Sequence, residues 1–168
     1  ERGAEYLKHI KGDFTLTRVN IDESVQTDIV HDLEKPLPME AGQYDHVLLI
    51  NVLEHIFEYR QLLAEAVRIL RPDGSVTIIV PFLFPIHPSP DDYWRFSGQA
   101  LTKELELLGL TRCRVQPLGS GVFAARHLLL DRLLPYPFRI LGDWAGRPIA
   151  TLLDAGFALL ARSLGKKY

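Results

Sequence analysis

The chain of 168 residues has little of what marks several common classes of protein. Cys113 is its only cysteine, so an internal disulfide and a cysteine-rich zinc site are excluded, and a reducing compartment such as the cytoplasm is expected. The formal net charge is −2, without the basic excess typical of nucleic-acid-binding domains, so we expect no nucleic-acid partner. No apolar run reaches the ~20 residues that a membrane-spanning helix needs, and the first residues show no apolar signal core.

Glycine is scarce at one informative place. Gly3 and Gly12 stand alone ahead of the first predicted strand, so no glycine-rich turn precedes Phe14. Such turns let the backbone approach a bound nucleotide closely. The length still suits one domain, and the apolar fraction of 47% is ordinary for a globular protein.

The stretch from Tyr44 to Pro81 is the most informative part of the chain. Tyr44–Asn51 ends in an apolar run and predicts a buried strand, and Ser75–Val80 predicts a second one. Between them, apolar residues recur at helical spacing, and Arg71–Gly74 predicts a turn. This βαβ unit predicts a parallel sheet, whose ligands bind at the carboxyl ends of the strands. The apolar helix positions are Leu53, Ile56, Leu63, Val67 and Leu70.

The remaining segments complete an α/β body, residues 1–120, followed by an apolar helical extension, residues 121–168, expected to pack on the same domain. Ser97 is a plausible N-cap for a helix that Gly109 closes. Further predicted helices are Glu1–Lys11, Val122–Leu134 and Pro148–Leu164, and further predicted strands are Phe14–Ile21, Thr27–His31 and Thr111–Leu118.

The C-terminal extension allows two interpretations. Its apolar helices favour packing against the sheet, or a contact between two copies of the chain. The alternative is a peripheral membrane contact, since Ile149–Leu164 is apolar and Lys166 and Lys167 follow it. Asp154 and Arg162 within the apolar stretch weaken that alternative.

Several motifs in series resemble class I S-adenosylmethionine-dependent methyltransferases, above all the small bacterial type 11 group. The first is Asp22, after the predicted strand that matches the second strand of the family, and Asp32-Leu33 follows ten residues later. The others are YDHVLLINVLEH, ILRPDGSVTIIVPF and the loop HPSPDDYWRF. The resemblance covers Val19 to about Leu118. It implies a Rossmann-like, mostly parallel sheet flanked by helices, and methyl transfer from S-adenosylmethionine to a small-molecule or glycan-type acceptor.

The resemblance also implies cofactor contacts. Asp22, with Glu23 as a second candidate, matches the acid that accepts the ribose hydroxyl hydrogen bonds. Asp32 matches the loop acid that faces the adenine amino group, and the backbone of Leu33 would lie beside the ring. Both acids have an alternative interpretation as carboxylates of exposed turns.

Two more residues are candidates for cofactor binding, and Asn51 matches the position that contacts the methionine part. Asn51 stands at the strand-to-helix junction, and His55 lies one turn into the predicted helix. Asn51 and Glu54 also have the spacing of a capping box, which would fix the start of the helix. A lone helix histidine is often structural, so a purely structural His55 is the alternative.

The loop Pro85–Phe96 is the predicted acceptor side of the site. Methyl transfer to oxygen or nitrogen needs an oriented nucleophile and often a base. His87 or Asp92 could be that base, and Tyr93 and Arg95 could position an acceptor. The alternative is a rigid lid in which Asp92 and Arg95 pair structurally. No recognised metal-ligand spacing is present, so no metal is expected.

The family's first strand and the glycine-rich turn after it have no counterpart in the sequence. In the family this strand lies between the second and the fourth, so its absence would leave strand edges with unpaired backbone groups. We therefore expect either a natural N-terminal segment missing from this sequence, or a degenerate module without activity that acts in dimerisation or partner binding. A nicotinamide-dependent enzyme is a further alternative, but it requires a GxGxxG turn.

Overall fold

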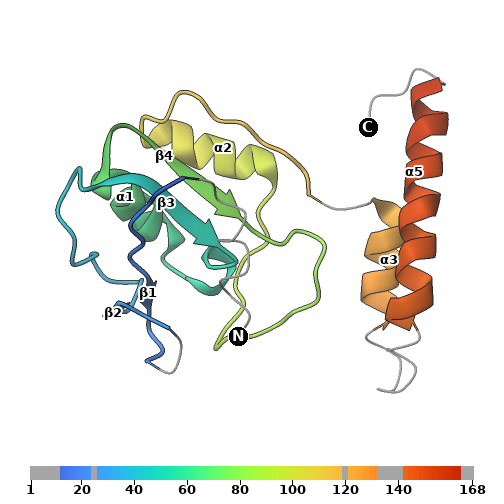
Figure 1. The fold of residues 1–168 in the computed structure, drawn as a ribbon, viewed down its shortest axis with the longest axis horizontal. Coiled ribbons are helices and arrows are strands. Elements are labelled where there is room, and N and C mark those ends of the chain that lie inside the picture. The colour runs from blue at the N-terminus through green and yellow to red at the C-terminus, as the bar shows by residue number, and fades with distance from the viewer. Residues whose placement is uncertain (1–11, 24–25, 119–120, 132–141, 164–168) are drawn as a thin grey trace. The chain divides into compact units, whose positions relative to one another are not determined.

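The computed structural model describes residues 12–23, 26–118, 121–131 and 142–163 (Figure 1). The helix predicted at Glu1–Lys11 lies outside these residues. The chain forms two compact units, residues 1–78 and residues 79–168, and each is described by itself.

The first unit begins with a short parallel pair of strands. β1 (Val19–Asn20) pairs with β2 (Ile29–Val30), and Val19 lies opposite Ile29. Both strands are shorter than predicted. Only two residues of the predicted strand Phe14–Ile21 and two of the predicted strand Thr27–His31 are in strands. Phe14 at one end of the predicted strand is 52% exposed, so little burial stabilises the pairing there.

A βαβ unit follows, as the sequence predicts. β3 (Tyr44–Ile50) and β4 (Leu70–Ile79) form a second sheet, and α1 (Tyr59–Ile69) connects them (Figure 1). Residue numbers rise in the same direction along β3 and along the residues of β4 that β3 contacts, so the two strands run parallel. The N–H of Gln43 donates to the carbonyl of Ile69, and the ring of His46 contacts Ser75 and Thr77. The core residues of this unit include Leu49, Leu62, Leu63, Ala66 and Ile69.

The predicted helix is interrupted near its start. Leu53–His55 forms a separate 3₁₀ turn, η2, and α1 begins only at Tyr59. The N–H of Phe57 donates to Glu34 Oε1 at 2.8 Å, which diverts a donor that a continuous helix would use internally. The predicted capping box is wrong, because Val52 is the N-cap residue of η2 and no side chain caps it.

The predicted turn at Arg71–Gly74 lies inside β4. Asp73 has a φ of +65°, so the strand bends there without ending. A Cβ on Gly74 would come within 2.9 Å of the Arg71 carbonyl and 3.1 Å of the Asp45 carbonyl. Glycine is therefore required where β4 passes β3. The segment predicted as a turn between the helix and the strand is instead a bend within β4.

The two strand pairs are separate sheets. β1 pairs with β2 and β3 with β4, and among the described residues no strand joins the two pairs. The mixed arrangement of parallel strands and helices confirms the predicted α/β, Rossmann-like fold class, whereas the expected single sheet appears as two pairs.

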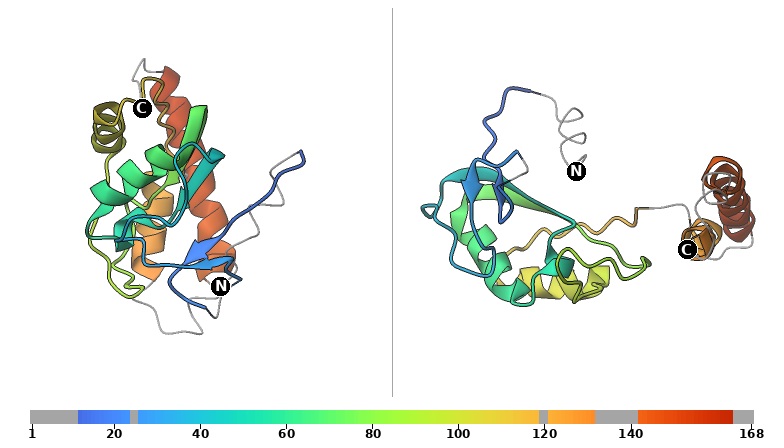
Figure 2. Two further views of the ribbon diagram at one scale, coloured as in Figure 1. Left: turned by 90° about the vertical axis from the view of Figure 1, so that its left-hand side faces the viewer. Right: turned by 90° about the horizontal axis from the view of Figure 1, so that it is seen from below.

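The second unit is mainly helical. α2 (Gly98–Leu107) begins as predicted, because Ser97 Oγ accepts from the N–H of Ala100 at 3.2 Å. The strand predicted at Thr111–Leu118 is wrong: that segment has no regular structure and is largely exposed. α3 (Val122–Asp131), the π-helical turn η3 (Gly142–Gly146) and α5 (Arg147–Ser163) follow. α3 and α5 lie side by side (Figure 2). No helix in the described part of the chain has both the length and the hydropathy needed to cross a bilayer.

Candidate active site

Two predicted cofactor acids lie at the same edge of the β1–β2 sheet. Asp22 follows the carboxyl end of β1 by two residues, and Asp32 follows that of β2 by two residues. Because these strands are parallel, their carboxyl ends meet at one edge. The structure therefore brings Asp22 and Asp32 to the edge where such sheets bind ligands.

The carboxylate of Asp32 also stabilises its own turn. Its Oδ1 accepts from the N–H of Glu34 at 3.0 Å, and its Oδ2 lies 3.4 Å from Lys35 Nζ. The hydrogen bond from the Glu34 N–H, followed by the Lys35 contact, holds the pKa of Asp32 below its ordinary value. The turn predicted as the alternative is thus confirmed. A carboxylate has about four acceptor positions, so this turn leaves Asp32 able to accept a further donor.

Hydrogen bonds to the backbone hold the turn that presents Asp22 and Glu23. The N–H of Asp22 donates to Asn20 Oδ1 at 3.1 Å, and Thr27 Oγ1 donates to the Asp22 carbonyl at 3.3 Å. Both acids are exposed at this turn. The turn ties the chain beyond β1 to the approach of β2.

Asn51 and His55 lie beyond the carboxyl end of β3, in the other sheet. Asn51 directly follows β3 and is exposed, with a φ of +50°. His55 is the last residue of η2, and its Nε2 lies 3.8 Å from Oε1 of the fully buried Glu54. These two residues therefore share no sheet edge with Asp22 and Asp32, although all four follow strands of the first unit.

A side-chain network that we did not identify from the sequence anchors the loop after Asp32 to α1. Glu65 Oε2 accepts from the N–H of Leu37 at 2.7 Å, and Arg68 donates to Glu65 and to the carbonyls of Leu37 and Met39. The Arg68 hydrogen bond lowers the pKa of Glu65 from its ordinary value. The sequence indicates this pair only through the spacing of Glu65 and Arg68, which are three residues apart on a predicted helix and can therefore contact each other.

In the second unit, the loop Pro85–Phe96 is organised around Asp92. The Asp92 side chain is 1% exposed and binds Arg95 through both oxygens, at 2.5 and 2.7 Å. Arg95 also donates to the carbonyls of Phe84, Pro85 and Trp94. Chiefly through this Arg95 pair, the pKa of Asp92 lies far below its usual range. The structural Asp92–Arg95 pair, the predicted alternative, is confirmed.

His87 is held against the same carboxylate. Asp92 Oδ2 accepts from the backbone N–H of His87 at 2.8 Å and lies 3.2 Å from its Nδ1. Nδ1 also lies 3.1 Å from the Pro85 carbonyl oxygen. Two acceptors around Nδ1 favour the tautomer that carries its proton there. Tyr93 is 45% exposed, and its hydroxyl donates to Asp91 Oδ2 at 3.0 Å.

Together, the βαβ unit and the acids beyond parallel strands define a Rossmann-like α/β domain. Residues 6–78 match the family model of a methyltransferase domain, so this part of the chain is similar to methyltransferases. The match ends where the first compact unit ends. No curated protein and no solved structure matches the chain.

Proposed function

We propose that the protein transfers a methyl group from S-adenosylmethionine to an oxygen or nitrogen of a small-molecule or glycan-type acceptor. The observation that carries the proposal is the placement of Asp22 and Asp32 at the carboxyl edge of a parallel strand pair in the region that matches the methyltransferase family. When bound, the cofactor would supply an electrophilic methyl group on a sulfonium sulfur.

The residues of the first unit fit the chemistry of this cofactor. Ribose hydroxyls are donors, and Asp22 and Glu23 are exposed carboxylates that accept. Asp32 stays ionised and retains capacity to accept from the adenine amino group, with Leu33 beside the ring. In this proposal Asn51 and His55 hold the methionine part.

On the acceptor side we propose His87 as the base. Its Nδ1 is oriented by Asp92 and the Pro85 carbonyl, so Nε2 is the atom that would take the proton of an acceptor hydroxyl or amine. Asp92 is the weaker of the two predicted bases, because its low pKa keeps it ionised and paired with Arg95. In this proposal Arg95 supports the loop, and Tyr93 positions the acceptor.

Calorimetric titration of the chain with S-adenosylhomocysteine tests the cofactor site. We expect binding, and we expect Asp22→Ala to weaken it about 10- to 100-fold, the loss of one or two hydrogen bonds to a charged group. Asp13→Ala is the matched control, because it removes the same charge from an exposed position ahead of β1.

Equal affinity of the Asp22→Ala variant and the parent chain would overturn the ribose assignment. A parent chain that is folded by circular dichroism and binds no S-adenosylhomocysteine would contradict the proposal. That result would instead support a methyltransferase-like module without activity.

A further inference from the structure

The α3–α5 hairpin carries an exposed apolar face that the proposed methyl transfer does not use. On α5, Ala150, Asp154 and Phe157 form the stripe that faces α3: Asp154 contacts the first turn of α3, and the rings of Phe157 and Phe123 lie 5.7 Å apart. A second stripe, formed by Leu152 and Leu159, is 72% and 66% exposed, and Ile149 beside the cleft is 57% exposed. The helix is therefore apolar over a wider arc than its contact with α3 requires.

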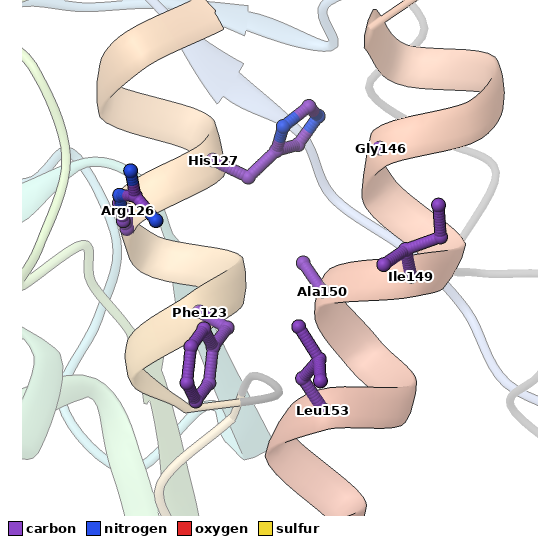
Figure 3. A pocket seen from close by; sticks show the side chains of 7 residues that line it. All are labelled: Phe123, Arg126, His127, Gly146, Ile149, Ala150 and Leu153. Carbon is purple, nitrogen blue, oxygen red and sulfur yellow. The ribbon is translucent and has the colours of Figure 1, made fainter.

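Exposed apolar residues continue outside this stripe. Trp144, in η3, is 81% exposed, and Val122 on α3 is 72% exposed. Between the helices lies an open cleft of about 290 Å³ (Figure 3). An apolar cavity of about 150 Å³ already accepts a benzene ring, so this cleft has room for part of an apolar chain. Its lining is Phe123, Arg126, His127, Gly146, Ile149, Ala150 and Leu153.

The charge of the hairpin region indicates what covers this face. In the described residues of this region, the basic residues are Arg126, Arg147 and Arg162, and one of the three aspartates, Asp154, is buried. Arg126, beside the cleft, and Arg147, at the start of α5, are exposed. A second copy of the hairpin would bring the same positive charge to the contact, whereas an anionic surface would complement it.

The position of Asp154 removes an objection that the sequence raises. Asp154 lies within the apolar helix, but it is only 7% exposed. Its two oxygens accept from the N–H groups of Phe123 and Ala124 at 2.9 and 2.8 Å, so it caps α3 instead of facing outward. Arg162, the other charged residue of the apolar stretch, is basic.

We propose that the α3–α5 hairpin docks the protein onto the surface of an anionic phospholipid bilayer. The apolar stripe and Trp144 enter the interface between headgroups and acyl chains, and Arg126 and Arg147 contact the phosphates. The cleft receives part of an acyl chain beside Arg126. The hairpin lies on the bilayer, in keeping with the absence of a spanning helix from the described residues.

Vesicle co-sedimentation of the full chain tests the proposal. We expect binding to vesicles of phosphatidylcholine with about one third phosphatidylglycerol, at least 10-fold weaker binding to phosphatidylcholine alone, and weaker binding as salt rises. The double variant Leu152→Asp with Leu159→Asp should reduce binding to the mixed vesicles at least 10-fold. Leu107→Asp is the matched control, because Leu107 on α2 is 74% exposed and should leave binding unchanged.

A second readout follows Trp144 directly. With Trp94→Phe, Trp144 is the only tryptophan, and its emission should shift to shorter wavelength on the mixed vesicles. No sedimentation with the mixed vesicles, or equal sedimentation of the Leu152/Leu159 variant, would overturn the proposal. So would a dimer in analytical ultracentrifugation that this variant dissociates, since a second copy would then occupy the face.

Discussion

At the scale of single residues, the clearest feature is the carboxylate of Asp92, which stabilises its loop through an ion pair. Asp92 belongs to the sequence DDYW, in which both acids look equivalent. The structure separates them: the side chain of Asp92 is 1% exposed between Arg95 and His87, whereas Asp91 is exposed and accepts from the Tyr93 hydroxyl. The two neighbours therefore have different roles, which side-chain burial decides.

Substitution of Asp92 by Asn should destabilise the second unit, because it leaves the partly buried Arg95 without its ion pair. We expect the free energy of unfolding at pH 7 to fall by about 2 kcal/mol. The pKa of Asp92 is lowered in the folded protein, so its stabilisation is present above the unfolded pKa of about 4 and is lost as the pH falls below it. Urea unfolding, followed by near-ultraviolet circular dichroism, measures both effects.

The control for this substitution is Asp91→Asn, the same chemical change one residue earlier. We expect it to alter the free energy of unfolding by less than about 0.5 kcal/mol, as for most exposed substitutions. If both variants lost the same stability, or if the deficit of Asp92→Asn persisted unchanged well below pH 4, the assigned role of the ion pair would be wrong.

At the scale of elements, α1 does more than cover the sheet. One face contributes buried Leu62, Leu63 and Ala66 to the core. Glu65 and Arg68 hold the loop that follows Asp32, through the N–H of Leu37 and two backbone carbonyls. The helix thus positions a loop that comes about thirty residues earlier in the chain and carries a proposed cofactor residue.

Arg68→Lys should release this loop while keeping the charge. Lysine cannot reproduce the paired guanidinium hydrogen bonds, so we expect a loss of about 1–2 kcal/mol in the free energy of unfolding. Amide hydrogen exchange of residues 33–39 should become faster. Arg60→Lys on the same helix is the control: Arg60 lies 5.0 Å from the Tyr59 ring, a contact that lysine can keep. Unchanged exchange in the loop would contradict the anchoring role.

At the scale of the whole molecule, the chain divides into two units that differ in structure. The family match falls within the first unit, whereas the α3–α5 hairpin belongs entirely to the second. Asp154 links the two helices of the hairpin, and a Cβ on Gly121 would come within 2.7 Å of its Oδ1. The interactions identified for each unit predict that each can be perturbed separately.

Asp154→Ala should loosen the hairpin alone. Loss of the cap on α3 costs about 1–2 kcal/mol, equivalent to roughly 5- to 30-fold faster exchange of amides protected by local structure. We expect this increase in residues 122–131 and 147–163 and unchanged exchange in α1, measured by hydrogen exchange with mass spectrometry. Thr151→Ala, at an exposed position on α5, is the control. Faster exchange in α1 would show that the units are coupled.

The sequence by itself determined the α/β class, the βαβ unit, the helix after Ser97 and the positions of the acids that follow strands. These features depend on local periodicity, caps and turn residues, which neighbouring residues specify. It also carried the motifs that resemble methyltransferases, and the comparison matches a methyltransferase domain over residues 6–78, ahead of the loop HPSPDDYWRF.

Tertiary structure decided what depends on distant partners. It interrupted the predicted helix between η2 and α1, where Phe57 donates to Glu34, and it bent β4 at Asp73 where the strand passes Asp45. It buried Asp92 and Asp154, which look like exposed acids in the sequence. Burial and long-range hydrogen bonds join residues many positions apart, so no local pattern can specify them.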